Sequence, residues 1–366
     1  MTTATPFPVI PPPQLQVFRN LSGFDAFVCD KMAPGRALTD VVTLKGSFEL
    51  RPDVVEETTP NEIQLADRVH DAERAELSSL AAAGEVMLEK PTTDLYLTGH
   101  ARTHDGRPRD RWVAGVAARS SRGPVVSHAL VATGPRTWTH RLGLGWKLGD
   151  PTPAAAVPLR YELAWGGAYP AGEDARWVTH EPNPSGRGFV SEAELARHDP
   201  LPAPQWELTD HPTGRPGHPR PLAGFGPIAR PWSSRLRHAG TYDQAWLTEA
   251  HRARERGELV DYPGDFDPRF FLCGPEALQA EARWEGDERI VLEGLVEGHE
   301  RLFTQLPGVR LLASVTRGAR VWAEEPIPLD TVHIDLDAGL VHLIWRLALP
   351  HARGIRGVVV GREDAS

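Results

Sequence analysis

Short runs of alternating apolar and polar residues recur along most of the chain and predict a mainly β protein. In the segment 331–335, for example, His333 and Asp335 alternate with Val332 and Ile334, which is the period of a half-buried strand. Gly and Pro interrupt these runs at short intervals, as they do in β-sandwiches and barrels. The predicted strands span residues 38–50, 93–100, 111–119, 125–132, 137–141, 159–165, 289–294, 301–305, 309–316, 331–335 and 340–349.

Helical patterning is sparse. Apolar residues lie at roughly helical spacing in 62–84, and two further helices are predicted at 245–256, ended by Gly257, and at 276–283. Between residues 166 and about 237 the chain has little periodicity and is dominated by Gly, Pro, His and Trp. Ordered loop regions of such length tend to be functional.

The expected architecture is therefore two β-sandwich or barrel-like regions joined by a long ordered loop region rich in Gly, Pro and Trp, with one or two short helices. The boundaries predicted for these regions are 1–165, 166–285 and 286–366, co-folded into one compact unit. A chain of 366 residues can bury enough surface to fold without a disulfide or metal.

Composition narrows the environment and the partners. The formal charge of −9 disfavours nucleic acid and anionic membranes as partners, because both repel an acidic protein. Cys29 and Cys273 are far apart and lack CxxC spacing, which favours a reducing compartment. Residues 1–13 lack the basic and apolar regions of a signal peptide, and no stretch approaches the ~20 apolar residues of a membrane span. A cytoplasmic location is expected.

Several glycine motifs could suggest phosphate binding, but the lysine of the GxxxxGK[ST] loop is absent. We therefore interpret these motifs as structural, because glycine permits positive φ and close approach of chains. The residues assigned to this structural role are Gly166, Gly167, Asn183, Gly186, Gly188, Gly224 and Gly226.

Candidate catalytic and metal-binding groups are weak. His100 and His104 precede a glycine-containing turn, while His211 and His218 lie in a Pro-rich loop, so neither pair predicts a zinc site. The acidic group Asp261, Asp265 and Asp267 could hold a cation or supply a glycosidase pair, yet Asp beside Pro and Gly commonly forms turns. Neither GxSxG nor HExxH occurs. No catalytic residue, metal or cofactor is predicted, and the protein is not expected to be an enzyme.

Trp and Arg, which are enriched at binding hot spots, occur close together in the central region. Core packing and cation–π stacking explain such pairs equally well. The candidate partner-binding residues are Trp165, Trp177, Arg187, Arg230, Trp232, Tyr242, Trp246, Asp265 and Asp267.

An ordered set of motifs between about residues 38 and 350 resembles a known family. These motifs are KPTTD (90–94), YELAWGG (161–167), NPSGRG (183–188), GFGPI (224–228), AGTYD (239–243), DFD (265–267), RFF (269–271), DTV (330–332) and WR (345–346). Together they are similar to the domain-of-unknown-function group of type VI secretion adaptors, which are encoded beside VgrG spike and PAAR-tip effector genes. Cys273 and Gly274 depart from the Ala-Pro step expected there.

The resemblance implies a chaperone-like adaptor that binds a PAAR-containing effector and promotes its loading onto the VgrG spike. Two other classes remain open from the residues alone. One is a hydrolase that uses Asp261, Asp265 or His211, and the other is a carbohydrate-binding protein that uses exposed Trp.

Overall fold

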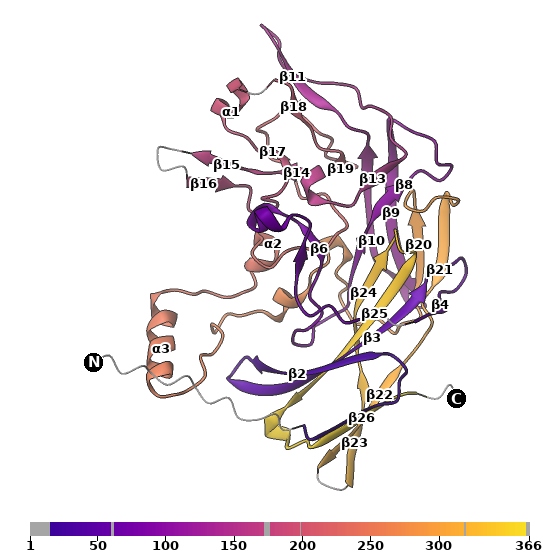
Figure 1. Ribbon diagram of the computed structural model, residues 1–366, viewed down its shortest axis with the longest axis vertical. Coiled ribbons are helices and arrows are strands. Elements are labelled where there is room, and N and C mark those ends of the chain that lie inside the picture. The colour runs from indigo at the N-terminus through magenta and orange to yellow at the C-terminus, as the bar shows by residue number, and fades with distance from the viewer. Residues whose placement is uncertain (1–14, 60–61, 172–175, 198, 318–319, 364–366) are drawn as a thin grey trace.

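The structure, a computed structural model, describes residues 15–59, 62–171, 176–197, 199–317 and 320–363 (Figure 1). Strands account for 43% of it and helices for 11%, which confirms the prediction of a mainly β protein. None of the sheets formed by these residues closes into a barrel.

The longest strand, β3 (Ala37–Glu49), belongs to a six-stranded sheet drawn from distant parts of the chain. The order of this sheet is β2 (Asp25–Ala33), β3, β25 (Leu340–Pro350), β24 (Leu329–Asp335) and β7 (Asp94–Thr98), with the short β4 (Glu56–Glu57) paired to β3. Neighbours are antiparallel except β24 and β7, which run parallel. Figure 1 shows yellow strands from late in the chain lying among indigo and violet strands from its beginning. The sheet therefore joins segments that the sequence analysis assigned to separate β regions.

Alternation along these strands gives the six-stranded sheet two different faces. Val42, Leu44, Leu343 and Trp345 point to one face and belong to the main apolar core. The opposite face carries polar side chains that are nonetheless buried, among them Lys45 and Arg346. A sheet with one apolar and one buried polar face needs a cover that can pair with charges.

Two further sheets pack on the same core. One is antiparallel, in the order β19 (Trp206–Leu208), β10 (Gly123–Thr133), β9 (Arg111–Ser120), β20 (Arg289–Glu293) and β21 (Arg301–Gln305). The other has the order β1 (Val17–Asn20), β26 (Gly357–Arg362), β22 (Leu311–Arg317) and β23 (Arg320–Ile327), with β1 parallel to β26. Buried residues of β9, β10, β20 and β22 join those of β3 and β25 in one continuous apolar cluster.

Short two- and three-stranded ribbons make up most of the upper part of Figure 1. They pair β11 (Thr137–Arg141) with β12 (Gly145–Leu148) and β18 (Leu201–Pro202), β13 (Ala156–Pro158) with β8 (His100–Arg102), β14 (Trp165–Gly166) with β17 (Arg187–Gly188), β15 (Ala168–Ala171) with β16 (Arg176–Thr179), and β5 (Arg68–Val69) with β6 (Leu80–Ala82).

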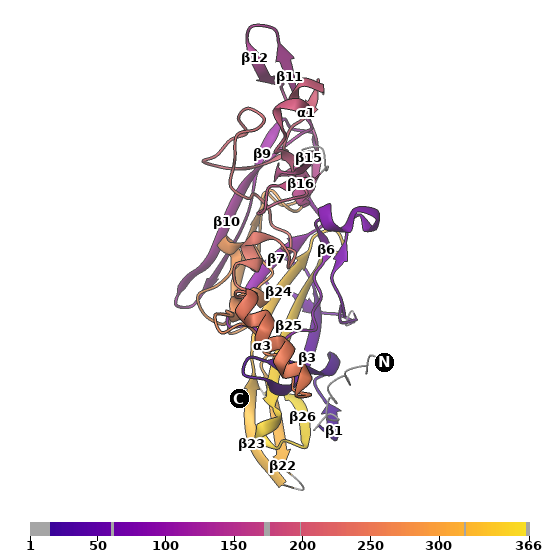
Figure 2. The same cartoon turned by 90° about the vertical axis from the view of Figure 1, so that its left-hand side faces the viewer.

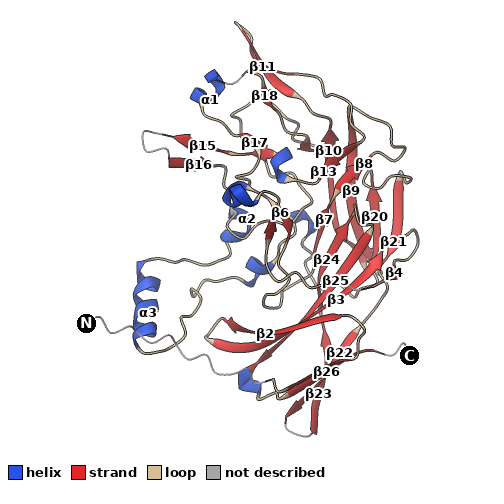
Figure 3. Cartoon of the chain, viewed as in Figure 1, coloured by secondary structure: helices blue, strands red, loops and turns tan. Residues whose placement is uncertain are grey.

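Helices are few and mostly of one or two turns. The α-helices are α1 (Glu192–Arg197), α2 (Ser233–Leu236) and α3 (Gln244–Glu255). Single turns or short 3₁₀ segments occur at η1 (Ala72–Leu77), η2 (Tyr161–Leu163), η3 (Pro268–Phe271), η4 (Glu276–Leu278) and η5 (His351–Arg353). Figure 3 shows α1, α2 and α3 on one side of the molecule, away from the large antiparallel sheet.

Several sequence predictions need correction. Residues 62–84 do not form a helix, because their polar groups pair with the six-stranded sheet and with each other in extended chain; only η1 is helical there. The predicted strand 159–165 contains η2, and the predicted helix 276–283 is reduced to η4. The helix at 245–256 is confirmed as α3, whose N-terminus is capped by Asp243 through Trp246 N–H.

Candidate functional site

The motifs YELAWGG (161–167) and NPSGRG (183–188) pack tightly around the side chain of Asn183, and we call this region the Asn183 cluster. The buried Asn183 side chain donates two hydrogen bonds of 2.9 Å, to the carbonyls of Tyr161 and Trp165. Gly166 has φ of 150°, and a Cβ there would lie 2.1 Å from the Asn183 carbonyl oxygen. No side chain fits in that space, so glycine is required by close approach of the two chains. Gly167, Gly186 and Gly188 have similarly little clearance.

Trp165 is a core residue of the Asn183 cluster. It is 2% exposed and meets Trp138 edge-to-face at 6.3 Å. Its side chain is therefore not on the surface where a partner could reach it, contrary to its selection as a candidate contact.

The second glycine motif packs against the Tyr161 ring. A Cβ on Gly224 would lie 2.2 Å from that ring, and the Tyr161 hydroxyl donates to the Gly226 carbonyl at 2.8 Å. Trp232, also 2% exposed, meets Tyr161 edge-to-face at 5.2 Å. The neighbouring Arg235 is buried and donates to the carbonyls of Ile228 and Phe270. Trp232 thus belongs to the core as well.

The sequence analysis did not predict the buried polar face of the six-stranded sheet. Lys90 Nζ lies 2.6 Å from Asp94 Oδ1, and both side chains are almost fully buried. The other carboxylate oxygen of Asp94 accepts the N–H groups of Cys273 and Gly274 at 2.5 and 2.7 Å. Burial opposes ionisation of Asp94, but Lys90 and these two N–H groups lower its pKa overall.

Further charges continue the buried layer. Arg346 pairs with Asp330 and donates twice to the Glu85 carbonyl, at 2.7 and 2.9 Å. The Glu85 carboxylate lies 2.8 Å from Lys45 Nζ. Each of these charges has a partner, so the layer is suited to fixing the covering segment on the sheet. The signal in the sequence was the alternation of polar residues in β3 opposite its apolar ones.

Two histidines complete this face and are held neutral. Burial is the main cause that lowers the pKa of His333 well below its usual range and that of His342 to about 4. His333 Nε2 lies 2.7 Å from Thr98 Oγ1, and His342 Nδ1 lies 3.0 Å from Ser47 Oγ. Cys273 is also buried, which raises the pKa of its thiol to about 11. Such groups are poor acids, bases or nucleophiles near neutral pH.

The acidic group of the sequence analysis caps backbone rather than holding a cation. Asp261 accepts the N–H groups of Gly35 and Tyr262, at 2.9 and 2.8 Å. Asp265 accepts from Thr241 N–H and hydroxyl.

Asp267 likewise starts η3 by accepting the Arg269 N–H at 2.9 Å and forms an ion pair with His238 at 3.3 Å. Asp265 and Asp267, chosen as partner contacts, therefore hold the loop around α3 in place.

Other candidates are exposed on segments that project from the body. Trp177 on β16 is 55% exposed and Tyr242, just before α3, is 50% exposed. Trp246 is half-buried, stacks edge-to-face on Tyr242 at 4.6 Å and donates to the Asp261 carbonyl. Figure 1 shows that the β15/β16 hairpin and α3 project from the same side of the molecule.

The two candidate arginines lie near these segments. Arg230 is largely exposed, with Asp67 3.6 Å away. Arg187 is half-buried in β17, and burial lowers its pKa.

Sequence reasoning also missed an apolar hairpin tip. Leu142 and Leu144, in the turn between β11 and β12, are 96% and 76% exposed. Figure 2 shows this hairpin extending beyond the rest of the fold. Leucines in a turn, where polar residues are usual, were the available signal.

One cavity is lined by His211, one of the residues named for the hydrolase alternative, but by neither Asp261 nor Asp265. It has a volume of about 550 Å³ and is lined by His128, Asp210, His211, Ser234 and Arg235, among others. His211 Nδ1 lies 2.9 Å from Asp210 Oδ1, at the exposed rim.

Both cysteines are free, and in the described residues no helix is long and apolar enough to cross a membrane. No curated protein and no solved structure matches this chain. A family of uncharacterized proteins conserved in bacteria (DUF2169) matches residues 35–346, which include the Asn183 cluster and the buried polar layer. The chain belongs to this family.

Proposed function

We propose that this protein is an adaptor or chaperone of a type VI secretion system, which binds a PAAR-containing effector in the cytoplasm and promotes its loading onto the VgrG spike. It would do so without catalysis and without a cofactor. The observation that carries the proposal is that large apolar side chains are exposed on projecting segments, while the charges of the buried layer on the six-stranded sheet are paired.

We define the projecting surface as Trp177 and Val178 on β16 together with Tyr242 and Leu247 beside and on α3. All four are at least one-third exposed. Aromatic residues lose little conformational entropy on binding and often act as anchors at the centre of an interface. Their placement on a hairpin and on a helix joined by loops suits contact with another protein.

Rigid support behind these anchors adds to the proposal. The loop that carries α3 is fixed by Asp261 to Gly35, and Arg36 forms an ion pair with Glu258 at 2.9 Å. A surface held in place before binding loses less free energy on association than a flexible one. Most residues of the motifs that resemble the secretion adaptors are buried or cap loops. These motifs therefore hold in place the segments that carry the exposed anchors.

The test is complex formation with the PAAR-domain protein encoded nearest to this gene. The two proteins are co-purified, and the dissociation constant is measured by calorimetry. Trp177→Ala and Tyr242→Ala are each expected to weaken binding by about 30-fold or more, the equivalent of ~2 kcal/mol at a hot spot, with an unchanged melting temperature.

Two tryptophans serve as controls. Trp322 on β23 is 48% exposed but lies far from the projecting surface, so Trp322→Ala should bind like the wild type. Trp232→Ala should instead lower the melting temperature, because Trp232 is core. Absence of a complex at micromolar concentration, or wild-type affinity in both Trp177→Ala and Tyr242→Ala, would refute the proposal.

A further inference from the structure

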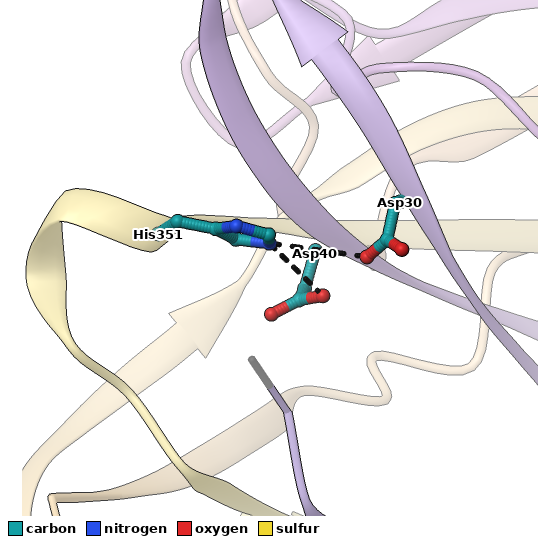
Figure 4. A group of neighbouring side chains, drawn as sticks. All are labelled: Asp30, Asp40 and His351. Carbon is teal, nitrogen blue, oxygen red and sulfur yellow. Dashed lines mark ion pairs between the residues drawn. The ribbon is translucent and has the colours of Figure 1, made fainter. Parts of the chain in front are cut away.

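A compact group of possible metal ligands lies where β2, β3 and η5 meet. Asp30 and Asp40 are directly opposite each other on β2 and β3, and His351 begins η5 just after β25. One oxygen of each carboxylate and Nε2 of His351 lie within 4.8 Å of one another. Figure 4 shows the imidazole and both carboxylates pointing toward a common centre.

These three atoms do not satisfy one another by hydrogen bonding. His351 Nε2 lies 3.4 Å from Asp40 Oδ1 and 3.8 Å from Asp30 Oδ1, whereas a charge-assisted hydrogen bond measures about 2.7–2.9 Å. All three atoms are buried without a hydrogen-bond partner. Asp40 is only 2% exposed, so this unpaired carboxylate oxygen is cut off from water. A buried, unpaired carboxylate is costly unless something else compensates its charge.

The 3.4 Å between His351 Nε2 and Asp40 Oδ1 matches the spacing of two ligands around a small cation, and the 3.8 Å to Asp30 Oδ1 would shorten on binding. Two donor atoms that each lie about 2.1 Å from a tetrahedral ion are about 3.4 Å apart. The charge agrees, since two carboxylates would neutralise a divalent ion.

We propose that Asp30, Asp40 and His351 bind one divalent transition-metal ion, of which zinc is the best match. Imidazole with carboxylates is a usual ligand set for zinc, and three protein ligands leave a fourth position for water. The Asp30 side chain is 25% exposed and provides the opening through which that water would enter. Calcium and magnesium are poor matches, because both prefer six or more ligands and mainly oxygen.

The ion would tie an edge strand to the body of the protein. β2 is the outer strand of the six-stranded sheet and pairs only with β3 among the described strands. His351 belongs to a different part of the chain, so a shared ion adds a crosslink between β2, β3 and the segment that follows β25. Edge strands held in this way are less free to separate.

The experiment uses the full chain without a histidine tag, treated with a chelator and then freed of it. Zinc chloride is titrated by calorimetry, calcium chloride is the comparison, and bound metal is counted by elemental analysis. One zinc ion per chain is expected, together with a higher melting temperature.

Asp30→Asn and Asp40→Asn preserve shape and are each expected to weaken zinc binding at least about tenfold. Asp30 is partly exposed, so Asp30→Asn should fold even if Asp40→Asn does not. The matched control is Asp210→Asn, in an exposed pair with His211, and it should bind zinc like the wild type. The proposal is overturned if no stoichiometric zinc binds, if calcium binds as well as zinc, or if the two site variants bind zinc like Asp210→Asn.

Discussion

Two regions of this protein use the same residue types in opposite ways. In the core beside the Tyr161 ring, Trp232 and Arg235 are buried, and Arg235 donates to two backbone carbonyls. On the projecting surface and near it, Trp177 and Arg230 are largely exposed, and Arg230 has only a distant ion pair. Residue type alone does not separate the two groups. The number of fixed partners around each side chain does.

The comparison teaches where the glycine and polar motifs of this chain act in its fold. The glycines, Asn183 and the pair of Lys90 and Asp94 determine how chains approach one another, while the exposed anchors stand outside that framework. Substitutions in the framework should therefore act on stability, and substitutions on the projecting segments should act on binding. The following predictions test this division.

The largest effect is expected from Gly166→Val. A Cβ there would lie 2.1 Å from the Asn183 carbonyl oxygen, and φ is positive, so the two chain segments that meet at Asn183 must separate. The expected loss of unfolding free energy is about 4 kcal/mol or more, measured by chemical denaturation. The control is Gly361→Val on β26, where nothing lies within 4 Å of the added Cβ. Equal stability of the two variants would contradict the structural role of Gly166.

Asp94→Ala should cost about 3–5 kcal/mol, because it leaves Lys90 buried without its partner. Arg301→Ala removes an exposed ion pair with Glu293 and should cost about 1 kcal/mol or less. Urea denaturation of both variants checks the difference. If Asp94→Ala is as stable as Arg301→Ala, the polar layer does not hold the cover on the sheet.

His342 predicts a pH dependence of stability. Its folded pKa is about 4 and its unfolded value is near 6.5, so the unfolded chain binds more protons between these values. Stability from this group is therefore present above pH 6.5 and is lost as the pH falls toward 4, by about 3 kcal/mol in total.

The measurement is unfolding free energy against pH for the wild type and for His342→Gln. The variant should show a smaller loss between pH 6.5 and 4, while His211→Gln, with an exposed histidine, should behave like the wild type. Parallel curves for the wild type and His342→Gln would show that His342 is not held neutral by the fold.

The smallest effect on stability is expected at the hairpin tip. Leu142 is 96% exposed, so Leu142→Ser should change the unfolding free energy by no more than about 0.5 kcal/mol. Thermal melting checks this directly. The same variant in the binding assay sharpens the comparison, because a weaker complex would add the β11/β12 hairpin to the projecting surface. A destabilised protein would instead place Leu142 in the framework.

The sequence predicted long strands such as β25 well, and it predicted α3, whose end Gly257 marks; the Asp243 cap of α3 was not predicted. It failed at 62–84, where apolar spacing suggested a helix. In the fold, Leu65 is exposed, and the N–H of Gln64 donates to the Glu85 side chain rather than forming a helical bond. Tertiary pairing with the polar face overrides local preference there.

The site was predicted less well for a related reason. Burial of Trp165 depends on Gly188, where an added Cβ would lie 2.3 Å from the indole ring, and local composition carries no information on that approach. The group of Asp30, Asp40 and His351 likewise arises from strand pairing and a distant turn. The Gly motifs were interpreted as structural because the phosphate-loop lysine is missing. In the fold, an added Cβ on Gly166, Gly186, Gly188 or Gly224 would lie less than 3 Å from a neighbouring atom.

The interleaving of early and late strands has a consequence for synthesis of the chain. β7 finds its parallel partner β24, and β3 its neighbour β25, only after more than half of the sequence has followed. At about 5–20 residues per second, that delay is roughly 10–50 s on the ribosome. During this time the apolar side of the β2/β3 hairpin has no cover, and its open edge can pair with other chains. Translation speed and cellular chaperones should therefore affect the yield of this protein more than they affect the yield of a fold built from consecutive strands.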